Sequence, residues 1–309
     1  MLAPARYIAD FARFAVQKSA QERDDTQALR ELEQRNLDLP AGLEITWLGV
    51  SGYRLTYEGH SLLIDPYVSR VPLRAVLRRT TAIPDPRMIE RFVGSPPRVA
   101  GVLVGHTHFD HAVDAPEIAR RFSAKAYGSS SLVALMRAHG LGALAVEVEP
   151  YRRYELGPFT ASFIPSLHSK LILGFAVPFD GELTCDHLDG LSPSAYRCGP
   201  VYGIRIEVGG ISFYHQGSAN LIDDAIRAQD VPVDYFLAGV AGRGFTRDYW
   251  RRILRRLEPH TIIPTHYDDF FRELSQPMGF STNVNLACVP DEVAAVGRDF
   301  EVAALPLLR

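Results

Sequence analysis

The sequence predicts an α/β fold with mixed β-sheets. Short apolar or alternating runs, which are typical of strands, recur along the 309 residues, and segments with helical spacing lie between them. Glycines interrupt the first of these runs, in LEITWLGVSGYRLTYEGHSLLIDP, in the manner of strands and hairpins. Because strand and helix patterns are interspersed along the chain, we expect helices packed on sheets within one domain.

The first 40 residues form a predicted helical extension, which precedes a single domain over residues 41–309. The extension carries an apolar stripe at close to helical spacing, made up of Tyr7, Ile8, Phe11 and Phe14. A charged stretch, QERDDTQALRELEQR, follows, and Pro40 and Gly42 mark the boundary. We expect the stripe to pack on its own domain. The alternatives are a membrane surface or a second subunit, which makes this helix the candidate interface of a homo-oligomer.

The domain begins with strands and hairpins between residues 43 and 66. Residues 71–98 hold several prolines and arginines and are predicted to form an irregular lid or loop with a short helix. An apolar strand at 102–104 leads into a histidine cluster, and Asp114 with Glu117 resembles a capping box that opens a helix through Arg121. The later elements are strands near 124–127, 145–149, 159–164, 202–208 and 211–215, a helix at 130–139, an inserted loop at 181–200, and the apolar runs YFLAGV and TIIPTH.

The composition favours a small-molecule substrate. Hydrophobic residues make up 47% of the chain and charged residues 22%, an ordinary globular mixture with enough apolar material for a core. The 33 basic and 36 acidic residues give a formal net charge of −3. The whole-chain charge therefore gives nucleic acid no long-range attraction, and no clear basic arm supports a nuclease.

The cysteine content and the N-terminal segment predict a cytoplasmic protein. Three cysteines cannot all pair within one chain, and so few do not make a disulfide framework. The segment MLAPARYIADFARFAV interrupts its apolar residues with Arg6, Asp10 and Arg13, unlike a signal peptide. No stretch reaches the roughly 18 to 20 apolar residues that a spanning helix needs, so no transmembrane segment is expected.

A dense cluster of candidate metal ligands follows the strand at 102–104. The segment HTHFDH places His106, His108, Asp110 and His111 within six residues. A tight loop held by a strand end can point imidazoles and a carboxylate into one space at fixed separation. Imidazole nitrogen and carboxylate oxygen are ligands that zinc and other first-row metals prefer. The cluster therefore indicates a metal site, and a polar surface loop is the alternative.

HTHFDH also matches the H-x-H-x-D-H signature of the metallo-β-lactamase superfamily, and the resemblance extends over roughly residues 43–275. Asp65 in SLLIDP resembles the family's strand-end aspartate, which supports the histidine loop. His168 in FIPSLHS and His266 in IIPTHYDDF stand where further ligand histidines are expected. The segment VDYFLAGVAGRGFTRDYW, with IIPTHY after it, is similar to the branch that contains L-ascorbate-6-phosphate lactonase and N-acylphosphatidylethanolamine phospholipase D. The resemblance implies a four-layer αββα sandwich of the metallo-β-lactamase type.

The resemblance further implies a hydrolase with two divalent metal ions. The ligand sets would be His106, His108 and His168 for one ion and Asp110, His111 and His266 for the other. Zinc is the default ion, and manganese, iron and nickel are alternatives for such ligands. Two ions can share a water molecule and lower its pKa. A metal-bound hydroxide would then hydrolyse a small ester, lactone or phosphodiester, with Asp110 as the catalytic residue that orients or deprotonates the water.

One position departs from the family's pattern. The family places a metal-bridging aspartate in a G-D-[ST]-like turn, whereas ISFYHQGSAN has Ser218 after Gly217. A neutral hydroxyl is a poor metal ligand, so occupancy of the second site is in question. The alternative function is therefore a catalytically impaired metal-binding or regulatory protein that retains the fold. Nearby groups that could replace the carboxylate are His215, Gln216, Asp223, Asp224, Asp186 and His187.

Two segments outside the motif have alternative interpretations. Cys185-Asp186-His187 could bind a further metal or supply a nucleophile, although an incidental polar loop is the default. The arginines between 70 and 91 could bind a phosphate or lipid head group, and the same stretch is equally consistent with a solvated lid. Arginines that converge on the metals would favour a phosphodiesterase, and an apolar pocket with few charges would favour a lactonase.

Overall fold

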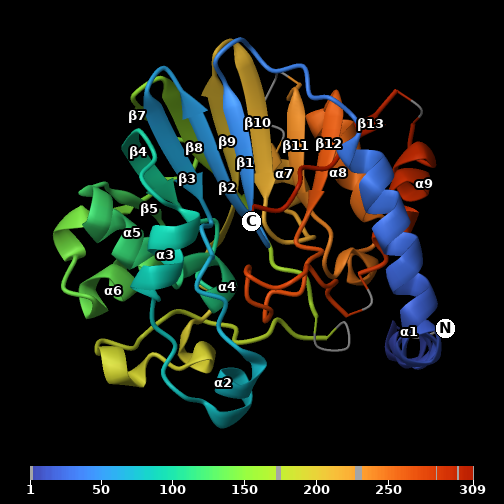
Figure 1. Cartoon of the computed structure of the whole chain (residues 1–309), viewed down its shortest axis with the longest axis horizontal. Helices are drawn as coiled ribbons and strands as arrows, with labels where there is room; N and C mark the ends of the chain where they lie inside the picture. The colour runs from blue at the N-terminus through green and yellow to red at the C-terminus, as the bar shows by residue number, and fades with distance from the viewer. Residues whose placement is uncertain (1–2, 172–174, 227–231, 283, 298, 309) are drawn as a thin grey trace.

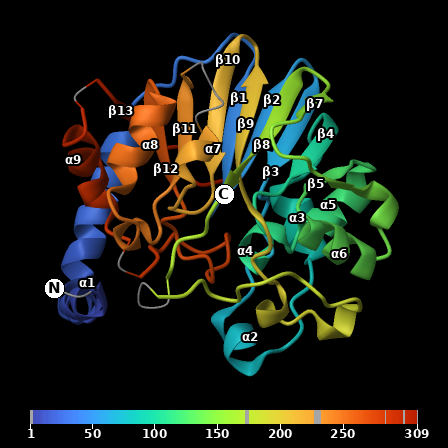
Figure 2. The same ribbon diagram turned by 180° about the vertical axis from the view of Figure 1, so that it is seen from behind.

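The structure of the chain is a computed structural model. In the part of the chain that it describes, two β-sheets pack face to face (Figure 1, Figure 2). The structure describes residues 3–171, 175–226, 232–282, 284–297 and 299–308, with side chains from residue 18 onward. Helices lie on the outer side of each sheet, so the layers follow the order helix, sheet, sheet, helix. The predicted α/β class and the αββα sandwich implied by the resemblance are confirmed.

The first sheet follows the order of the chain. Its strands are β1 (Glu44–Gly49), β2 (Gly52–Tyr57), β3 (His60–Ile64), β4 (Arg98–Leu103), β5 (Ala126–Gly128) and β6 (Ala145–Glu147). The strands from β1 to β3 pair antiparallel, and those from β3 to β6 pair parallel. Parallel neighbours require long crossover connections, and helices between β3 and β6 supply them.

The second sheet has the strand order β13-β12-β11-β10-β9-β8-β7. Its strands are β7 (Arg153–Leu156), β8 (Phe159–Ser166), β9 (Val201–Val208), β10 (Ile211–Gln216), β11 (Tyr235–Gly239), β12 (Thr261–Thr265) and β13 (Glu301–Val302). The strands from β7 to β10 pair antiparallel, and those from β10 to β13 pair parallel. Both sheets are therefore mixed, as predicted.

The helices divide between the two sheets. Beside the first sheet lie α3 (Pro86–Phe92), α4 (Phe109–Ala112), α5 (Ala115–Phe122) and α6 (Ser130–Ala138). Beside the second sheet lie α1 (Ala3–Glu33), α7 (Asp223–Ile226), α8 (Tyr249–Leu257) and α9 (Val289–Ala294). Helix α2 (Leu73–Arg78) lies below the lower edge of the sheets in Figure 1. Short 3-10 turns are η1 (Gly142–Leu144), η2 (Leu188–Gly190), η3 (Pro193–Ala195), η4 (Arg243–Phe245) and η5 (Leu286–Cys288). Among the described helices, none is long and apolar enough to cross a membrane.

Alternation along β3 separates two hydrophobic cores. Leu62 and Ile64 belong to the core that includes the space between the sheets, whereas Leu63 belongs to the core under the helices of the first sheet. All three side chains are fully buried. Successive side chains of a strand point to opposite faces, so a strand covered on both faces must be apolar throughout. The uninterrupted apolar run Leu62-Leu63-Ile64 in the sequence has this cause.

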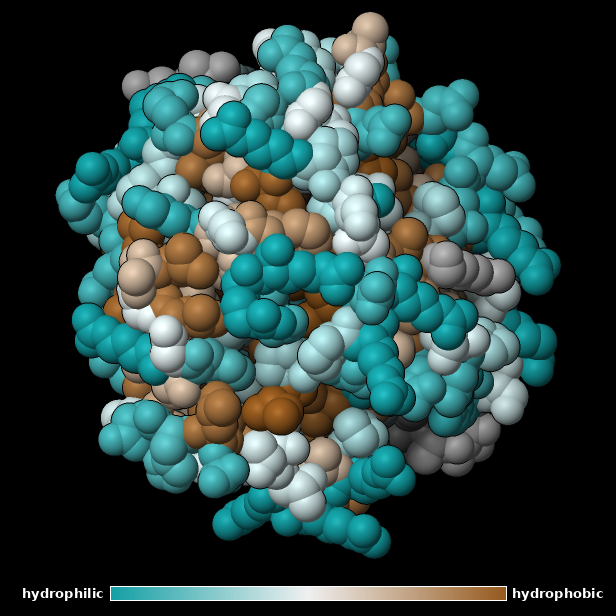
Figure 3. All heavy atoms as spheres, turned by 60° about the vertical axis from the view of Figure 1, so that its left-hand side comes forward, coloured by the Kyte–Doolittle hydropathy of each residue, from teal (hydrophilic) through white to brown (hydrophobic). Residues whose placement is uncertain are grey.

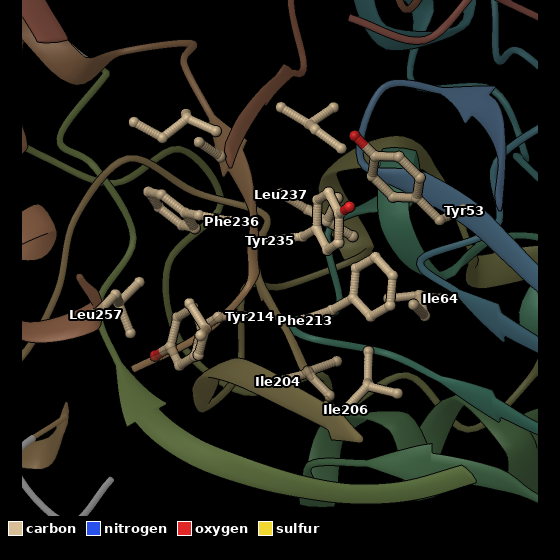
Figure 4. Packing of buried hydrophobic residues seen from close by; sticks show 14 of the residues in the cluster. Tyr53, Ile64, Ile204, Ile206, Phe213, Tyr214, Tyr235, Phe236, Leu237 and Leu257 are labelled. Atoms are coloured by element: carbon tan, nitrogen blue, oxygen red, sulfur yellow. The ribbon is translucent and has the colours of Figure 1, made fainter. Parts of the chain in front are cut away.

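The second sheet shows the same alternation in Figure 4. Phe213 of β10 lies on the side of Ile64 from the first sheet, whereas Tyr214 lies on the opposite side, toward Leu257 of α8. Helix α8 buries its apolar stripe against this sheet and leaves arginines facing outward. The core therefore continues through the second sheet from one layer to the next.

The C-terminal half of α1 packs on the domain. Leu29 and Leu32 are buried in the main core, and the carboxylate of Asp25 accepts a hydrogen bond from the backbone N–H of Ala287 at 2.9 Å. The carbonyl of Leu32 accepts from the backbone N–H of Ala304 at 3.1 Å. This half of the helix is therefore fixed to the sandwich by both apolar and polar contacts.

The apolar stripe predicted on the first half of α1, Tyr7, Ile8, Phe11 and Phe14, lies outside the side chains that the structure describes. The homo-oligomer interface and the division of the chain at residue 40 stay predictions.

The predicted capping box at Asp114 is wrong. Helix α5 begins at Ala115, but the Asp114 carboxylate caps none of its N–H groups. It accepts hydrogen bonds instead from the backbone N–H groups of Val68 at 2.6 Å and Ser69 at 2.8 Å. The buried carboxylate therefore ties the loop after β3 to the loop that follows the histidine cluster, and this tertiary demand overrides the local pattern.

We expect Leu63→Ala to lower the free energy of unfolding by about 2–5 kcal/mol, because it opens a cavity in the core beneath the helices. Leu77→Ala is the matched control, since the Leu77 side chain is 75% exposed, and its effect should stay within about 0.5 kcal/mol. Urea unfolding measures both variants. Equal losses would contradict the placement of Leu63 in the core.

Candidate metal centre

Strands β3, β4, β8 and β12 end at one edge of the sandwich. β3 and β4 are parallel, so Asp65 and the loop from His106 leave the first sheet on the same side. In the second sheet β8 and β10 run in the same direction because β9 pairs antiparallel with both, and β12 is parallel to them through β11. His168 after β8 and His266 after β12 therefore reach the same edge, where α4 lies in Figure 1.

His106, His108 and His168 form the first candidate group of ligands. One ring nitrogen of each lies within 4.8 Å of those of the other two. The ring centroid of His106 is 4.9 Å from those of both His108 and His168, which are themselves 4.6 Å apart. Three imidazoles at this spacing match a site of three protein ligands with a position left for water.

Asp110, His111 and His266 form the second candidate group, with ligand atoms that also lie within 4.8 Å of one another. Oδ2 of Asp110 is 3.2 Å from Nε2 of His266 and 3.8 Å from Nε2 of His111. The two groups adjoin, because the ring centroids of His106 and His111 are 3.8 Å apart. The structure thus brings together all six side chains that the sequence singled out, in the two sets that the resemblance implied.

Backbone carbonyls orient two of the histidines. Nε2 of His108 donates a hydrogen bond to the carbonyl of Pro178 at 2.7 Å, and Nδ1 of His168 donates to the carbonyl of Ser169 at 2.7 Å. The proton on each ring is therefore assigned to the nitrogen that faces the backbone, and the other nitrogen keeps its lone pair for a metal.

Asp65 orients His111. Oδ2 of Asp65 accepts a hydrogen bond from Nδ1 of His111 at 2.8 Å, and Oδ1 accepts from the backbone N–H of Gly105 at 2.7 Å. A Cβ atom added to Gly217 would come within 2.9 Å of Oδ2, so the glycine leaves room for this carboxylate. Asp65 therefore has the supporting position expected from the resemblance.

His106 provides a test of whether a metal fits the site. Its Nε2 atom is buried and has no hydrogen-bond partner among the described residues. A buried polar atom in this state costs about 1–3 kcal/mol unless another group satisfies it. A divalent ion would do so, and the donor set of imidazoles and one carboxylate is the set that such ions bind. The residues present fit a metal.

The first group is electrically neutral at neutral pH. Burial and the neighbouring imidazoles hold the pKa values of His106 and His168 well below the usual range of histidine. Burial also lowers the pKa of His108 to about 4. A metal ligand must be an unprotonated imidazole, so this group needs no proton release to bind an ion at pH 7.

The second group is charged. Burial alone would lower the pKa of His111, but the carboxylates of Asp110 and Asp65 outweigh it and raise that pKa above its ordinary value. Burial would raise the pKa of Asp110, but the histidines around it hold that pKa below its usual range. A proton on His111 therefore competes with a metal ion up to a higher pH than a proton on an ordinary histidine would.

A turn at Val50, between β1 and β2, holds the residues that carry His266. Val50 has a left-handed φ of 52°, which is rare for a β-branched residue. Its carbonyl accepts hydrogen bonds from the backbone N–H of His266 at 2.8 Å, from Nε1 of Trp47 at 3.1 Å and from the Thr265 hydroxyl. Its N–H donates to Oδ1 of Asp268 at 2.8 Å.

Arg70 completes this network. Its Nη2 atom donates to Oδ2 of Asp268 at 2.7 Å, and both side chains are buried. A Cβ atom added to Gly49 would come within 1.9 Å of that nitrogen, so the glycine makes room for the guanidinium. Sequence reasoning missed this ion pair and placed Arg70 with a surface stretch, because no local pattern connects residues that are 198 positions apart.

Ser218, where the family has a bridging carboxylate, contacts the loop that follows His168. Its hydroxyl accepts a hydrogen bond from the backbone N–H of Ser169 at 3.0 Å and lies 3.3 Å from the Ser169 hydroxyl. The serine therefore holds the loop that carries a candidate ligand.

No described residue supplies a replacement carboxylate to the two candidate groups. The residues considered from the sequence were His215, Gln216, Asp223, Asp224, Asp186 and His187. Nε2 of His215 donates to a backbone carbonyl, Asp223 forms ion pairs with arginines of α8, and Asp186 pairs with His187 on an exposed loop. The thiol of Cys185 donates to the carbonyl of His187, and the described residues form no third metal group there.

Aromatic rings surround the candidate ligands. The ring centroid of Phe179 lies 6.4 Å from that of His108, and the centroid of Phe270 lies 5.9 Å from that of His266. The hydrogen bonds and ion pairs of the six candidate ligands involve carboxylates, backbone carbonyls and one another; among the described residues, none involves arginine or lysine. Among the described residues, the arginines between 70 and 91 thus make no hydrogen bond or ion pair with the candidate ligands.

The two candidate groups should release metal at different pH. Protonation of His111, whose pKa is raised, weakens the second group as the pH falls below neutrality, whereas His108 resists protonation until about pH 4. Dialysis at pH 7.5, 6.5 and 5.5 followed by elemental analysis should show loss of one equivalent first. His266→Ala, which lacks a ligand of the second group, should keep its metal down to pH 5.5. Simultaneous loss of both equivalents would contradict this order.

We expect Asp268→Ala to lower the free energy of unfolding by about 3–5 kcal/mol, because it leaves the buried Arg70 guanidinium without a partner. Asp223→Ala is the control, since it breaks partly exposed pairs with Arg252 and Arg256 and should cost no more than about 1 kcal/mol. Urea unfolding compares the two. A similar loss of unfolding free energy in both variants would contradict the larger contribution expected from the buried pair of Asp268 and Arg70.

The chain matches known proteins over most of its length. Residues 44–266 match the family described as the β-lactamase superfamily domain. A relative from Carboxydothermus hydrogenoformans, named a UPF0173 metal-dependent hydrolase, is 28% identical over 230 residues, which make up 73% of this chain and 85% of the relative.

Solved structures share the fold. Igni18, a metallo hydrolase from Ignicoccus hospitalis, gives a TM-score of 0.53 at 18% identity, over 86% of this chain and 96% of that one. The metallo-β-lactamase fold protein YhfI from Bacillus subtilis gives a TM-score of 0.50 at 17% identity, over 86% of this chain and 98% of that one. Because the family match spans strands β1 to β12 and all the candidate ligands, the chain belongs to the β-lactamase superfamily.

Proposed function

We propose that this chain is a metal-dependent hydrolase that holds two divalent ions, zinc by default, and cleaves uncharged esters or lactones. The observation that carries the proposal is the pair of three-ligand groups beside aromatic side chains. The relative from Carboxydothermus hydrogenoformans is named a metal-dependent hydrolase, which supports hydrolytic chemistry here.

The chain's own residues would bind the ions, orient a water molecule and accept its proton. When bound, the ions would supply Lewis acidity and lower the pKa of a water molecule. Asp110 is ionised at neutral pH, and its Oδ2 atom is 3.2 Å from Nε2 of His266 and 3.8 Å from Nε2 of His111, so it can orient that water and accept its proton. His108 and His168 are kept in one ring orientation by backbone carbonyls, which limits the geometry that an ion can adopt.

The surroundings favour an uncharged substrate over a phosphodiester. A phosphodiester carries a negative charge that arginine or lysine commonly matches, and the described contacts of the candidate ligands include neither. Phe179 and Phe270 beside the ligands provide apolar surface, and Leu167 and Phe175, from the segment around His168, are exposed. Apolar side chains beside the ligands suit an acyl chain or a lactone ring.

Ser218 favours a second candidate function, a metal-binding or regulatory protein without turnover. The hydroxyl gives the two ions no shared carboxylate, so the second ion would be held by Asp110, His111 and His266 alone. Metal content separates the two functions only when it is measured together with hydrolysis.

The first experiment measures metal per chain by elemental analysis, on protein purified without added metal, for wild type, His108→Ala and His266→Ala. We expect near two equivalents in wild type and a partial loss in each variant. The kcat/KM for p-nitrophenyl butyrate or a δ-lactone should fall at least about 100-fold in both variants, because loss of a supporting group alone costs 10- to 100-fold. His187→Ala, which changes an exposed histidine outside both groups, is the control and should retain metal and activity.

Each outcome selects one function. Two equivalents without hydrolysis of any ester or lactone would favour the binding protein. One equivalent that His108→Ala removes and His266→Ala leaves untouched would show a vacant second site. Faster hydrolysis of bis(p-nitrophenyl) phosphate than of the esters would overturn the substrate class but keep the hydrolase.

A further inference from the structure

Helix α2 exposes large apolar side chains at the edge where the candidate centre lies. Leu73 is 48% exposed and Leu77 is 75% exposed, and residues four positions apart share one face of a helix. Ile83, in the loop that follows, is 49% exposed. Single exposed leucines are ordinary, but apolar side chains grouped in this way mark an interaction surface.

Arginines lie among these apolar side chains. Arg74, Arg78 and Arg79 are exposed. Among the described residues, the arginines that form ion pairs are others, so these three guanidinium groups have no acidic partner. Residues 72–84 contain these three cations and no acidic residue, although the whole chain has a net charge of −3. The carboxylate of Asp85, next along the chain, is bonded to the first N–H groups of α3. We call Leu73, Arg74, Leu77, Arg78 and Arg79 the α2 surface.

The start of this segment is fixed to the candidate centre. Asp114, which follows the histidine loop, binds the backbone N–H groups of Val68 and Ser69 just before α2. The Tyr67 hydroxyl donates to the carbonyl of Phe270 at 3.1 Å, beside the ring that contacts His266. The α2 surface therefore keeps a set position relative to the ligands.

The end of the segment is also fixed. The backbone N–H of Ala82 donates to the carbonyl of Leu191 at 2.7 Å, and the buried Tyr196 hydroxyl donates to the carbonyl of Ala82 at 2.7 Å. α2 lies below α4 in both Figure 1 and Figure 2. Figure 3 shows hydrophobic and hydrophilic side chains next to each other along that lower edge.

These features together fit an anionic lipid membrane. Exposed leucines can enter the boundary between head groups and acyl chains, and guanidinium groups bind lipid phosphates. Each arginine near an anionic bilayer strengthens binding about fivefold. We propose that the α2 surface docks the chain reversibly on anionic membranes, with the candidate centre facing the bilayer side. This docking goes beyond the proposed hydrolysis and does not require it.

The test is co-sedimentation of the full chain with phosphatidylcholine vesicles that contain or lack phosphatidylglycerol. We expect binding only to the anionic vesicles, and weaker binding at high salt. The triple variant Arg74→Gln/Arg78→Gln/Arg79→Gln should lower the partition coefficient at least about tenfold. Leu73→Ser/Leu77→Ser should lower it as well, which a purely electrostatic contact would not require.

The matched control is Arg247→Gln/Arg251→Gln/Arg255→Gln, which removes the same charge from exposed arginines at and beside α8. It should bind vesicles as wild type does. Equal loss in both triple variants, or no binding of wild type at low salt, would overturn the proposal. Self-association that the α2 triple variant abolishes, without vesicle binding, would overturn it in favour of a second copy of the chain. His108→Ala should bind vesicles normally, so loss of hydrolysis and loss of docking are separable results.

Discussion

The backbone of Val50 joins the two sheets at the edge where the candidate ligands lie. Its carbonyl accepts hydrogen bonds from the end of β12, and its N–H is held by a carboxylate whose other oxygen binds Arg70 after β3. The positions of His266 and of the first sheet's loops therefore depend on one another. A buried ion pair is a weak source of stability, but removal of one partner leaves a charge without compensation. Arg70 and Asp268 are thus better understood as a positional constraint than as a source of folding energy.

Carboxylates determine how the two halves of the centre differ. The first group has no carboxylate, and its imidazoles are neutral because burial disfavours the charged form. The second group contains Asp110 and has Asp65 beside it, and these two carboxylates raise the pKa of His111. Asp110 is the one carboxylate among the six candidate ligands, and the uncharged Ser218 adds no second one. When bound, two divalent ions would stabilise the negative charge that develops on a carbonyl oxygen during the attack of water.

The sequence predicted the parts of the site that depend on residue type and strand ends. Four candidate ligands followed from one dense motif, and His168 and His266 followed from the resemblance to the metallo-β-lactamase superfamily. The structure brings all six together, because parallel strands bring their ends to one edge. The capping box at Asp114 failed because the competing N–H groups of Val68 and Ser69 belong to a distant loop. The pair of Arg70 and Asp268 had no local pattern at all. The sequence alone showed that a serine stands at position 218 in place of a carboxylate. Its hydrogen bond with Ser169 could be seen only in the folded structure.

Several non-glycine residues at this edge share left-handed backbone conformations. Val50 has a φ of 52°, Asp65 of 41°, Arg70 of 49° and His266 of 62°. Aspartate and histidine tolerate this region better than valine, and each such residue costs about 1–3 kcal/mol that the surrounding contacts must offset. Any replacement at these positions must therefore keep a left-handed backbone, so the edge limits sequence change through backbone shape as well as through ligand identity. A variant that kept every candidate ligand would still lose the arrangement of this edge if its strand ends relaxed into ordinary conformations.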